Sequence, residues 1–146
     1  MRRTMLFLPG NTPNMLINGD TLGADTIIFD LEDAVSPDEK DAARILVRNA
    51  LKYQSFPSCE VVVRINPTDT EFWKEDLKAI IPLKPDVIMP TKVNGGAMIQ
   101  EVSAYMTEVE KESGLEVGTV KILPLIETAM GCLLYTSDAA DEGRGV

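Results

Sequence analysis

The sequence contains no histidine, and this absence excludes several kinds of site at once. Without histidine there is no Ser-His or Cys-His catalytic pair and no imidazole ligand for a transition metal. The 2 cysteines, Cys59 and Cys132, lie far apart and in no CxxC pair, so neither a disulfide framework nor a zinc site is expected. Chemistry in this chain therefore depends on carboxylates, lysine, arginine, hydroxyls or an oxygen-ligated hard metal ion.

Basic residues and long apolar runs are also scarce. The 146 residues include 14 Lys and Arg against 23 Asp and Glu, which gives a net charge of −9. We therefore expect no general binding to nucleic acid or to anionic membranes, because both need a positive field. No apolar run approaches the ~20 residues of a membrane span. Pro9 stops the short apolar stretch near the N-terminus before it reaches signal-peptide length, so we expect a cytoplasmic protein.

Short apolar segments alternate with amphipathic ones along the whole chain. The apolar segments predict five buried strands, at residues 5–8, 26–29, 60–65, 87–89 and 120–127. Helices are predicted between them, at residues 13–21, 37–53, 71–81 and 97–113, with another starting at 128. In the second helix the predicted apolar face is Ala42, Ile45, Leu46, Ala50 and Leu51. This alternation is typical of a parallel α/β fold, either doubly wound or a (β/α)8 barrel.

Charged or polar residues follow every predicted strand from the second onward. They are Asp30, Glu32 and Asp33, then Arg64 and Asn66, then Thr91 and Lys92, and finally Glu127. The strands of a parallel barrel share one mouth at their carboxyl ends, so this recurrence favours a barrel. Each acid of the first group taken alone is equally well explained as a helix cap, but three carboxylates within four residues favour a functional site. No GxGxxG or GxxxxGK[ST] motif follows a strand, so nucleotide binding of those kinds has no support.

Five motifs occur in an order that is familiar from one family. They are Arg3-Thr-Met-Leu-Phe-Leu-Pro-Gly-Asn11, Gly23-Ala-Asp-Thr-Ile-Ile-Phe-Asp-Leu-Glu-Asp-Ala-Val35, Glu39-Lys-Asp-Ala-Ala-Arg44, Val63-Arg-Ile-Asn-Pro67 and Ile126-Glu-Thr-Ala129. Over roughly the first 131 residues, the chain resembles the citrate lyase beta-subunit family of the HpcH/HpaI aldolase superfamily. The resemblance implies a (β/α)8 barrel with Mg²⁺ at its mouth. It also implies retro-Claisen cleavage of a citryl thioester to oxaloacetate and an acetyl thioester.

The same resemblance implies roles for individual residues. Arg64 would bind a substrate carboxylate, and Glu127 would ligate Mg²⁺ and thereby contact the substrate. From the chemistry of carboxylates rather than from the resemblance, Glu32 or Asp33 is expected to support the water shell of the metal or to relay a proton, and these two possibilities stay open. The remaining implied residues, Arg3 and Lys40, would lie toward the phosphates of a pantetheine arm.

Each of these roles has a structural alternative. Arg64 could form a structural ion pair, although a cation emerging from a buried strand needs a partner. Glu127 could cap a helix, and Lys92 could be a solvated side chain. Lys40 and Arg44 could be solvated charges on one helix face.

The implied partners are a citryl thioester on acyl carrier protein or coenzyme A, the other citrate lyase subunits, and further copies in an oligomer. A malyl-CoA-type lyase keeps the chemistry and changes the substrate. A non-catalytic partner in an acyl-carrier complex is the alternative from a different class, and such a scaffold need not bind Mg²⁺.

The family pattern ends near Gly131. Residues 1–131 are predicted to be a truncated lyase barrel domain with about five of eight βα units. Residues 132–146 resemble a translated sequencing adapter and are predicted to be foreign. Because the missing units would leave two unpaired sheet edges, we expect the chain alone to be unstable and inactive.

Overall fold

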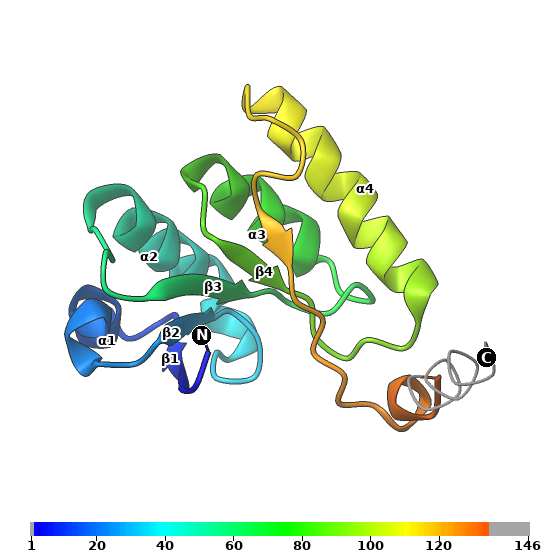
Figure 1. Cartoon of the computed structure of the whole chain (residues 1–146), viewed down its shortest axis with the longest axis horizontal. Helices are drawn as coiled ribbons and strands as arrows, with labels where there is room; N and C mark the ends of the chain where they lie inside the picture. Colours follow the sequence, from blue (N-terminus) through cyan, green and yellow to red (C-terminus); the bar gives the residue numbers. More distant parts are fainter. Residues whose placement is uncertain (1, 135–146) are drawn as a thin grey trace, which may run out of the picture.

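The computed structural model describes residues 2–134, which form a parallel five-stranded sheet covered by helices (Figure 1). The strands are β1 (Met5–Pro9), β2 (Thr26–Asp30), β3 (Glu60–Arg64), β4 (Val87–Met89) and β5 (Lys121–Ile122). The longer helices are α1 (Pro13–Asn18), α2 (Lys40–Tyr53), α3 (Phe72–Ile80) and α4 (Gly96–Glu112). Residues 129–134 are also helical, as predicted.

The order of the strands distinguishes the two fold classes left open by the alternation of elements. Neighbouring strands in the sheet are consecutive in the chain, in the order β1-β2-β3-β4-β5, and every pair is parallel. A doubly wound sheet reverses direction at a switch point and carries helices on both faces. Here α1, α2, α3 and α4 contact one another in chain order, and Figure 1 shows the last three side by side. The barrel-type prediction is confirmed.

Side chains of each strand alternate between the helix-covered outer face and the inner face. Ile27 and Phe29 of β2 belong to the main core with the helices, whereas Ile28 packs with Val62 and other inner residues in a second, smaller cluster. Asp30 follows this alternation onto the inner face. The charged residue that ends β2 therefore lies inside the curved sheet, at its carboxyl edge.

The last strand, β5, comprises only Lys121 and Ile122 and is therefore shorter than the predicted segment 120–127. The backbone N–H groups of Leu123 and Leu125 still donate to the carbonyls of Ile88 and Pro90, each at 2.9 Å. Extended pairing with the preceding segment thus continues to residue 125. Among the described strands, β5 is one of the two edge strands, with β1 at the other edge.

The buried stripe of helix α2 overlaps the predicted one in part, because Ala50 is buried and Leu46 and Leu51 pack against the core. Ile45 is 48% exposed, whereas Ala43 and Val47 are fully buried. The buried positions Lys40, Ala43, Val47 and Ala50 recur every three or four residues, as a helix face requires. The prediction was wrong for Ile45 and missed the first position of this stripe, which is a lysine and is therefore excluded from an apolar pattern.

The proposed foreign segment, residues 132–146, lies outside the described residues except for its first three positions, and its origin stays a prediction. Within residues 2–134, the helices are all too short or too polar to cross a bilayer.

Candidate active site

Two charged side chains at the carboxyl edge of the sheet form a bidentate pair. Asp30 and Arg64 end β2 and β3 and are register partners. Arg64 Nε donates to Asp30 Oδ1 at 2.7 Å, and Nη2 donates to Oδ2. The Asp30 carboxylate also accepts the backbone N–H groups of Glu32 (2.8 Å) and Ala34 (3.0 Å). Burial raises the pKa of Asp30, but the hydrogen bonds from Arg64 and the backbone outweigh it and hold this pKa below its ordinary value.

The pairing with Asp30 uses only one edge of the Arg64 guanidinium. A guanidinium has five N–H donors, so two are engaged and the outer donors on Nη1 and Nη2 remain available. The guanidinium carbon lies over the Phe7 ring of β1, 4.8 Å from the ring centroid, in a cation–π contact. The free edge presents the planar fork that matches a carboxylate. Asp30 therefore orients Arg64 while leaving it able to bind an anion.

Glu32 lies between two cations. Its side chain is 4% exposed, with Oε1 at 2.8 Å from Lys92 Nζ and Oε2 at 3.4 Å from Arg64 Nη1. Among the described residues, Oε2 has no hydrogen-bond donor although it is buried. Such an oxygen is costly to leave unsatisfied, so a ligand that brings a donor to it gains affinity. Asp33, in contrast, is 67% exposed and lies 3.8 Å from Lys92 Nζ.

Lys40 fixes the loop that carries these carboxylates. Its Nζ donates to the backbone carbonyls of Leu31 (2.7 Å) and Glu32 (2.6 Å) from the first turn of α2. Burial lowers the pKa of Lys40, and the nearby carboxylates of Glu32 and Asp30 partly offset this effect. The ammonium thus lies beneath the site rather than on a solvated helix face. Its predicted contact with a pantetheine phosphate stays a prediction.

Lys92, which follows β4, and Glu127, which follows β5, are joined by a hydrogen bond at the carboxyl edge of the sheet. The Lys92 backbone N–H donates to Glu127 Oε1 at 3.0 Å, while the Lys92 ammonium reaches Glu32. The hydrogen bond to Glu32 raises the pKa of Lys92, so this side chain stays charged. Glu127 is exposed, and among the described residues only its Oε1 accepts a hydrogen bond.

The described residues can supply some of the ligands of a magnesium site. Mg²⁺ is commonly bound by one or two carboxylates together with water and substrate oxygens. Glu127 is an exposed carboxylate at the mouth, and the buried Glu32 Oε2 is an oxygen without a donor. No group of three acidic or cysteine ligands occurs within the part of the chain that is described. Of the described residues, Glu127 is the one that would hold such a metal at the mouth.

Arg3 lies away from this cluster. Its guanidinium pairs with Asp25 at 2.8 Å, and both residues precede the first residues of β1 and β2. The structure therefore places Arg3 at the amino edge of the sheet, opposite the mouth, where the pair lowers the pKa of Asp25 through the side-chain hydrogen bond. The structure brings together Glu32, Asp33, Arg64 and Glu127, with Lys40 below them, and does not bring Arg3 to them.

A buried carboxylate that the sequence did not single out, Asp76 of α3, organises the loop after β3. Its Oδ2 accepts the backbone N–H (3.1 Å) and Nδ2 (2.8 Å) of Asn66, and its Oδ1 accepts Arg44 Nε at 2.8 Å. Arg44 also pairs with Asp41 at 2.6 Å, and its side chain is only 12% exposed. Arg44 is therefore part of a buried network and not a solvated helix-face charge. No local pattern signals Asp76, because an acid within an amphipathic helix usually faces water.

We expect Asp76→Ala to lower the free energy of unfolding by about 3 kcal/mol, because the buried Arg44 and Asn66 lose their shared acceptor. The matched control is Glu75→Ala, which removes an exposed neighbour paired with Lys78 at 3.4 Å and should change stability by less than about 0.5 kcal/mol. Urea unfolding followed by fluorescence of the buried Trp73 measures both. Equal effects of the two substitutions would contradict the network.

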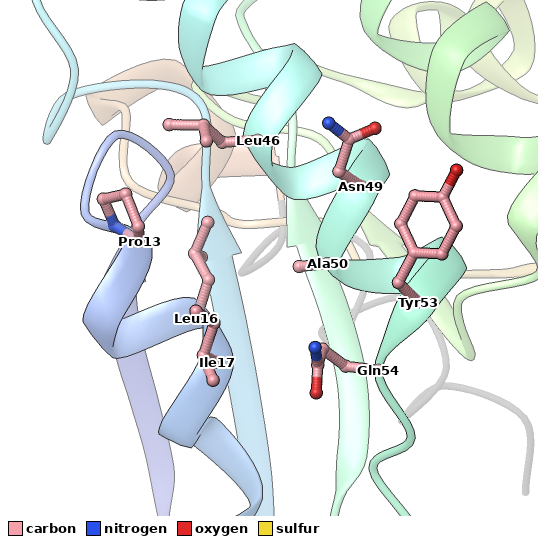
Figure 2. A pocket seen from close by; sticks show the side chains of 8 residues that line it. All are labelled: Pro13, Leu16, Ile17, Leu46, Asn49, Ala50, Tyr53 and Gln54. Carbon is pink, nitrogen blue, oxygen red and sulfur yellow. The ribbon is translucent and has the colours of Figure 1, made fainter.

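An apolar groove of about 200 Å³ lies elsewhere on the described surface. Figure 2 shows it between α1 and α2, with Leu16 and Ile17 on one side and Leu46 and Ala50 on the other. Its lining contains no carboxylate, lysine or arginine. The groove is on the outer wall of the sheet, away from the charged cluster, and contributes nothing to the chemistry of the site.

A singly wound parallel sheet with charged groups at the carboxyl ends of successive strands defines a protein of the α/β-barrel class. The chain belongs to the HpcH/HpaI aldolase/citrate lyase family, whose model matches residues 3–139.

Comparison with known proteins agrees with this assignment. The chain is 46% identical over 148 residues to the citrate lyase subunit beta of Leuconostoc mesenteroides subsp. cremoris, covering 100% of this chain and 49% of that protein. It is 36% identical over 138 residues to a (3S)-malyl-CoA thioesterase of Cereibacter sphaeroides, covering 94% and 45%. A solved citrate lyase beta subunit from M. tuberculosis, complexed with oxaloacetate and magnesium, superposes with a TM-score of 0.70 at 27% identity, covering 95% of this chain and 55% of that one. The chain spans about half the length of the curated relatives it matches.

Proposed function

We propose that this chain provides the substrate-recognition half of a magnesium-dependent lyase that cleaves a citryl thioester to oxaloacetate and an acetyl thioester. The observation that carries the proposal is the buried Glu32 Oε2, which lacks a donor and lies 3.4 Å from Arg64 Nη1. A hydroxy acid supplies both missing partners, since its carboxylate matches the free edge of Arg64 and its hydroxyl is a donor for Glu32. The family and the relatives support the same reaction.

In the proposed reaction, Arg64 holds a carboxylate and Glu32 Oε2 accepts the proton of the tertiary hydroxyl. The hydroxyl carbon becomes the ketone of oxaloacetate as its bond to the neighbouring carbon breaks. The bond electrons pass to the thioester as an enolate, which takes up a proton to become the acetyl thioester. Asp33, 67% exposed beside Lys92, exchanges protons between the site and solvent.

A bound Mg²⁺ would polarise the forming ketone as a Lewis acid, and Glu127 would hold it at the mouth. The partners that follow from the proposal are acyl carrier protein or coenzyme A as thioester carrier, and the other subunits of a citrate lyase complex. In this conformation the Lys40 ammonium donates to two backbone carbonyls of the loop that carries Glu32. We propose that its role is to hold the Glu32 loop in place.

The test compares two proteins. The first is the chain as it stands, and the second, the fused protein, joins residues 1–131 to the carboxyl-terminal half of the Leuconostoc mesenteroides relative. We expect Mg²⁺-dependent release of oxaloacetate from citryl-CoA by the fused protein only, because three barrel strands follow the five described here in a complete barrel. No release by either protein, with the relative itself active as control, would overturn the lyase proposal.

A malyl-type substrate is the second candidate, because a (3S)-malyl-CoA thioesterase is among the relatives. The same assay decides between the two if malyl-CoA is supplied in parallel and glyoxylate is measured. Faster turnover of malyl-CoA than of citryl-CoA would favour this alternative. A non-catalytic scaffold predicts neither product and no requirement for Glu127.

A further inference from the structure

Lys92 has an unusual backbone conformation. Among the described residues, only Lys92 (φ 52°) and Lys84 (φ 57°) adopt positive φ without being glycine. For a lysine this left-handed conformation costs roughly 1–2 kcal/mol, and such strain persists where surrounding contacts hold it, often at functional sites. For Lys92 the holding contacts are the backbone hydrogen bond to Glu127 and the ion pair with Glu32. Both contacts belong to the site.

The Lys92 side chain retains capacity to bind a ligand. An ammonium has three N–H donors, and one of them is engaged by Glu32 Oε1 at 2.8 Å. Asp33 Oδ1, at 3.8 Å, is beyond hydrogen-bond distance. The side chain remains 48% exposed at the mouth, so two donors are available to a bound anion.

Lys92 and Arg64 flank one carboxylate. Each approaches a different oxygen of Glu32, so the two cations stand on either side of it. Beside Lys92 is a hollow of about 70 Å³ between the loops after β3 and β4, with room for a small group but not for a coenzyme. Its lining residues are Pro67, Thr68, Asp69, Lys92, Asn94 and Met98. Lys92 is the cationic member of this lining.

We propose that Lys92 binds a second carboxylate of the substrate and thereby selects citryl over malyl thioesters. The inference rests on the proposed lyase function. A citryl thioester has two free carboxylates and yields the dianion oxaloacetate, whereas a malyl thioester has one and yields the monoanion glyoxylate. Arg64 has one free edge and can hold one carboxylate bidentately, so a second carboxylate requires another cation. Lys92 is placed to provide it.

The test uses three variants of the fused protein, which contains every residue of the site. Lys92→Asn removes the charge but tolerates the left-handed backbone, and Lys92→Arg keeps the charge. Lys84→Asn is the matched control, because Lys84 is an exposed lysine with the same backbone conformation away from the mouth. Calorimetry with Mg²⁺ present measures the affinities for oxaloacetate and for glyoxylate.

We expect Lys92→Asn to weaken oxaloacetate binding by about 10- to 100-fold and to change glyoxylate binding by less than about threefold. Lys92→Arg should restore most of the affinity, and Lys84→Asn should leave it unchanged. Equal weakening for both ligands would indicate a structural role and overturn the inference. Unchanged oxaloacetate affinity in Lys92→Asn, or no oxaloacetate binding by the unsubstituted protein, would overturn it as well. Because binding is measured without turnover, oxaloacetate binding without citryl-CoA cleavage would reject the lyase proposal separately.

Discussion

Replacing Arg64 with alanine in the fused protein is expected to lower kcat/KM for citryl-CoA by at least about 100-fold. The substrate carboxylate would lose its bidentate partner, and removal of one partner of a buried charge pair typically costs about 2–5 kcal/mol, with 1.36 kcal/mol for each factor of ten in rate. Steady-state kinetics of oxaloacetate release gives the value directly. Arg48→Ala is the control, because Arg48 is exposed on α2 and remote from the site.

The same substitution is expected to destabilise the fold. Asp30 and Glu32 are 1% and 3% exposed, and both would lose their Arg64 partner. Unpaired buried carboxylates cost about 3 kcal/mol in the free energy of unfolding, measured by urea titration. Loss of activity with unchanged stability would show that the buried Asp30 carboxylate needs no Arg64 partner to stabilise the fold. That result would contradict the pairing of the two residues.

Replacing Glu127 with glutamine should abolish the response to Mg²⁺ and lower kcat/KM by about 100- to 1000-fold, because a Lewis acid contributes several kcal/mol to the barrier. The amide oxygen of glutamine can still accept the Lys92 N–H, so the loop geometry is retained. Since Glu127 is exposed, the free energy of unfolding should change by less than about 0.5 kcal/mol.

The matched control for Glu127→Gln is Glu108→Gln, an exposed position on α4 away from the mouth. It should leave both turnover and its dependence on Mg²⁺ concentration unchanged. Full Mg²⁺-dependent turnover by Glu127→Gln would show that Glu127 does not hold the metal and would contradict its proposed role.

Much of the architecture could be predicted because local signals and fold agree. The run from Thr26 to Phe29 is apolar on both faces, and such runs occur in strands covered on both sides. Proline directly after an N-cap residue correctly predicted that a helical segment begins at Pro37. The alternation of strands and helices predicted one shared edge for the charged and polar residues that follow the strands from the second onward, because the carboxyl ends of parallel strands coincide.

The pairing of the charges could not be predicted, because it depends on register. Asp30 and Arg64 are 34 positions apart, and only the alignment of β2 with β3 makes them direct partners. The hydrogen bonds of Lys40 to two backbone carbonyls could not be predicted either, because no local pattern shows that the loop after β2 lies within reach of its long side chain. Arg3 shares a motif with β1, yet it precedes the strand and so faces the opposite edge.

We propose that the free edge of Arg64 and the Glu127 carboxylate together form the binding site of an oxo acid. A crystal structure of the fused protein with oxaloacetate and Mg²⁺ would show this site. We expect a ligand carboxylate on Arg64 Nη1 and Nη2, with the Asp30 pair intact and Mg²⁺ about 2.0–2.1 Å from a Glu127 oxygen. Oxaloacetate bound elsewhere, or Mg²⁺ held without Glu127, would contradict it.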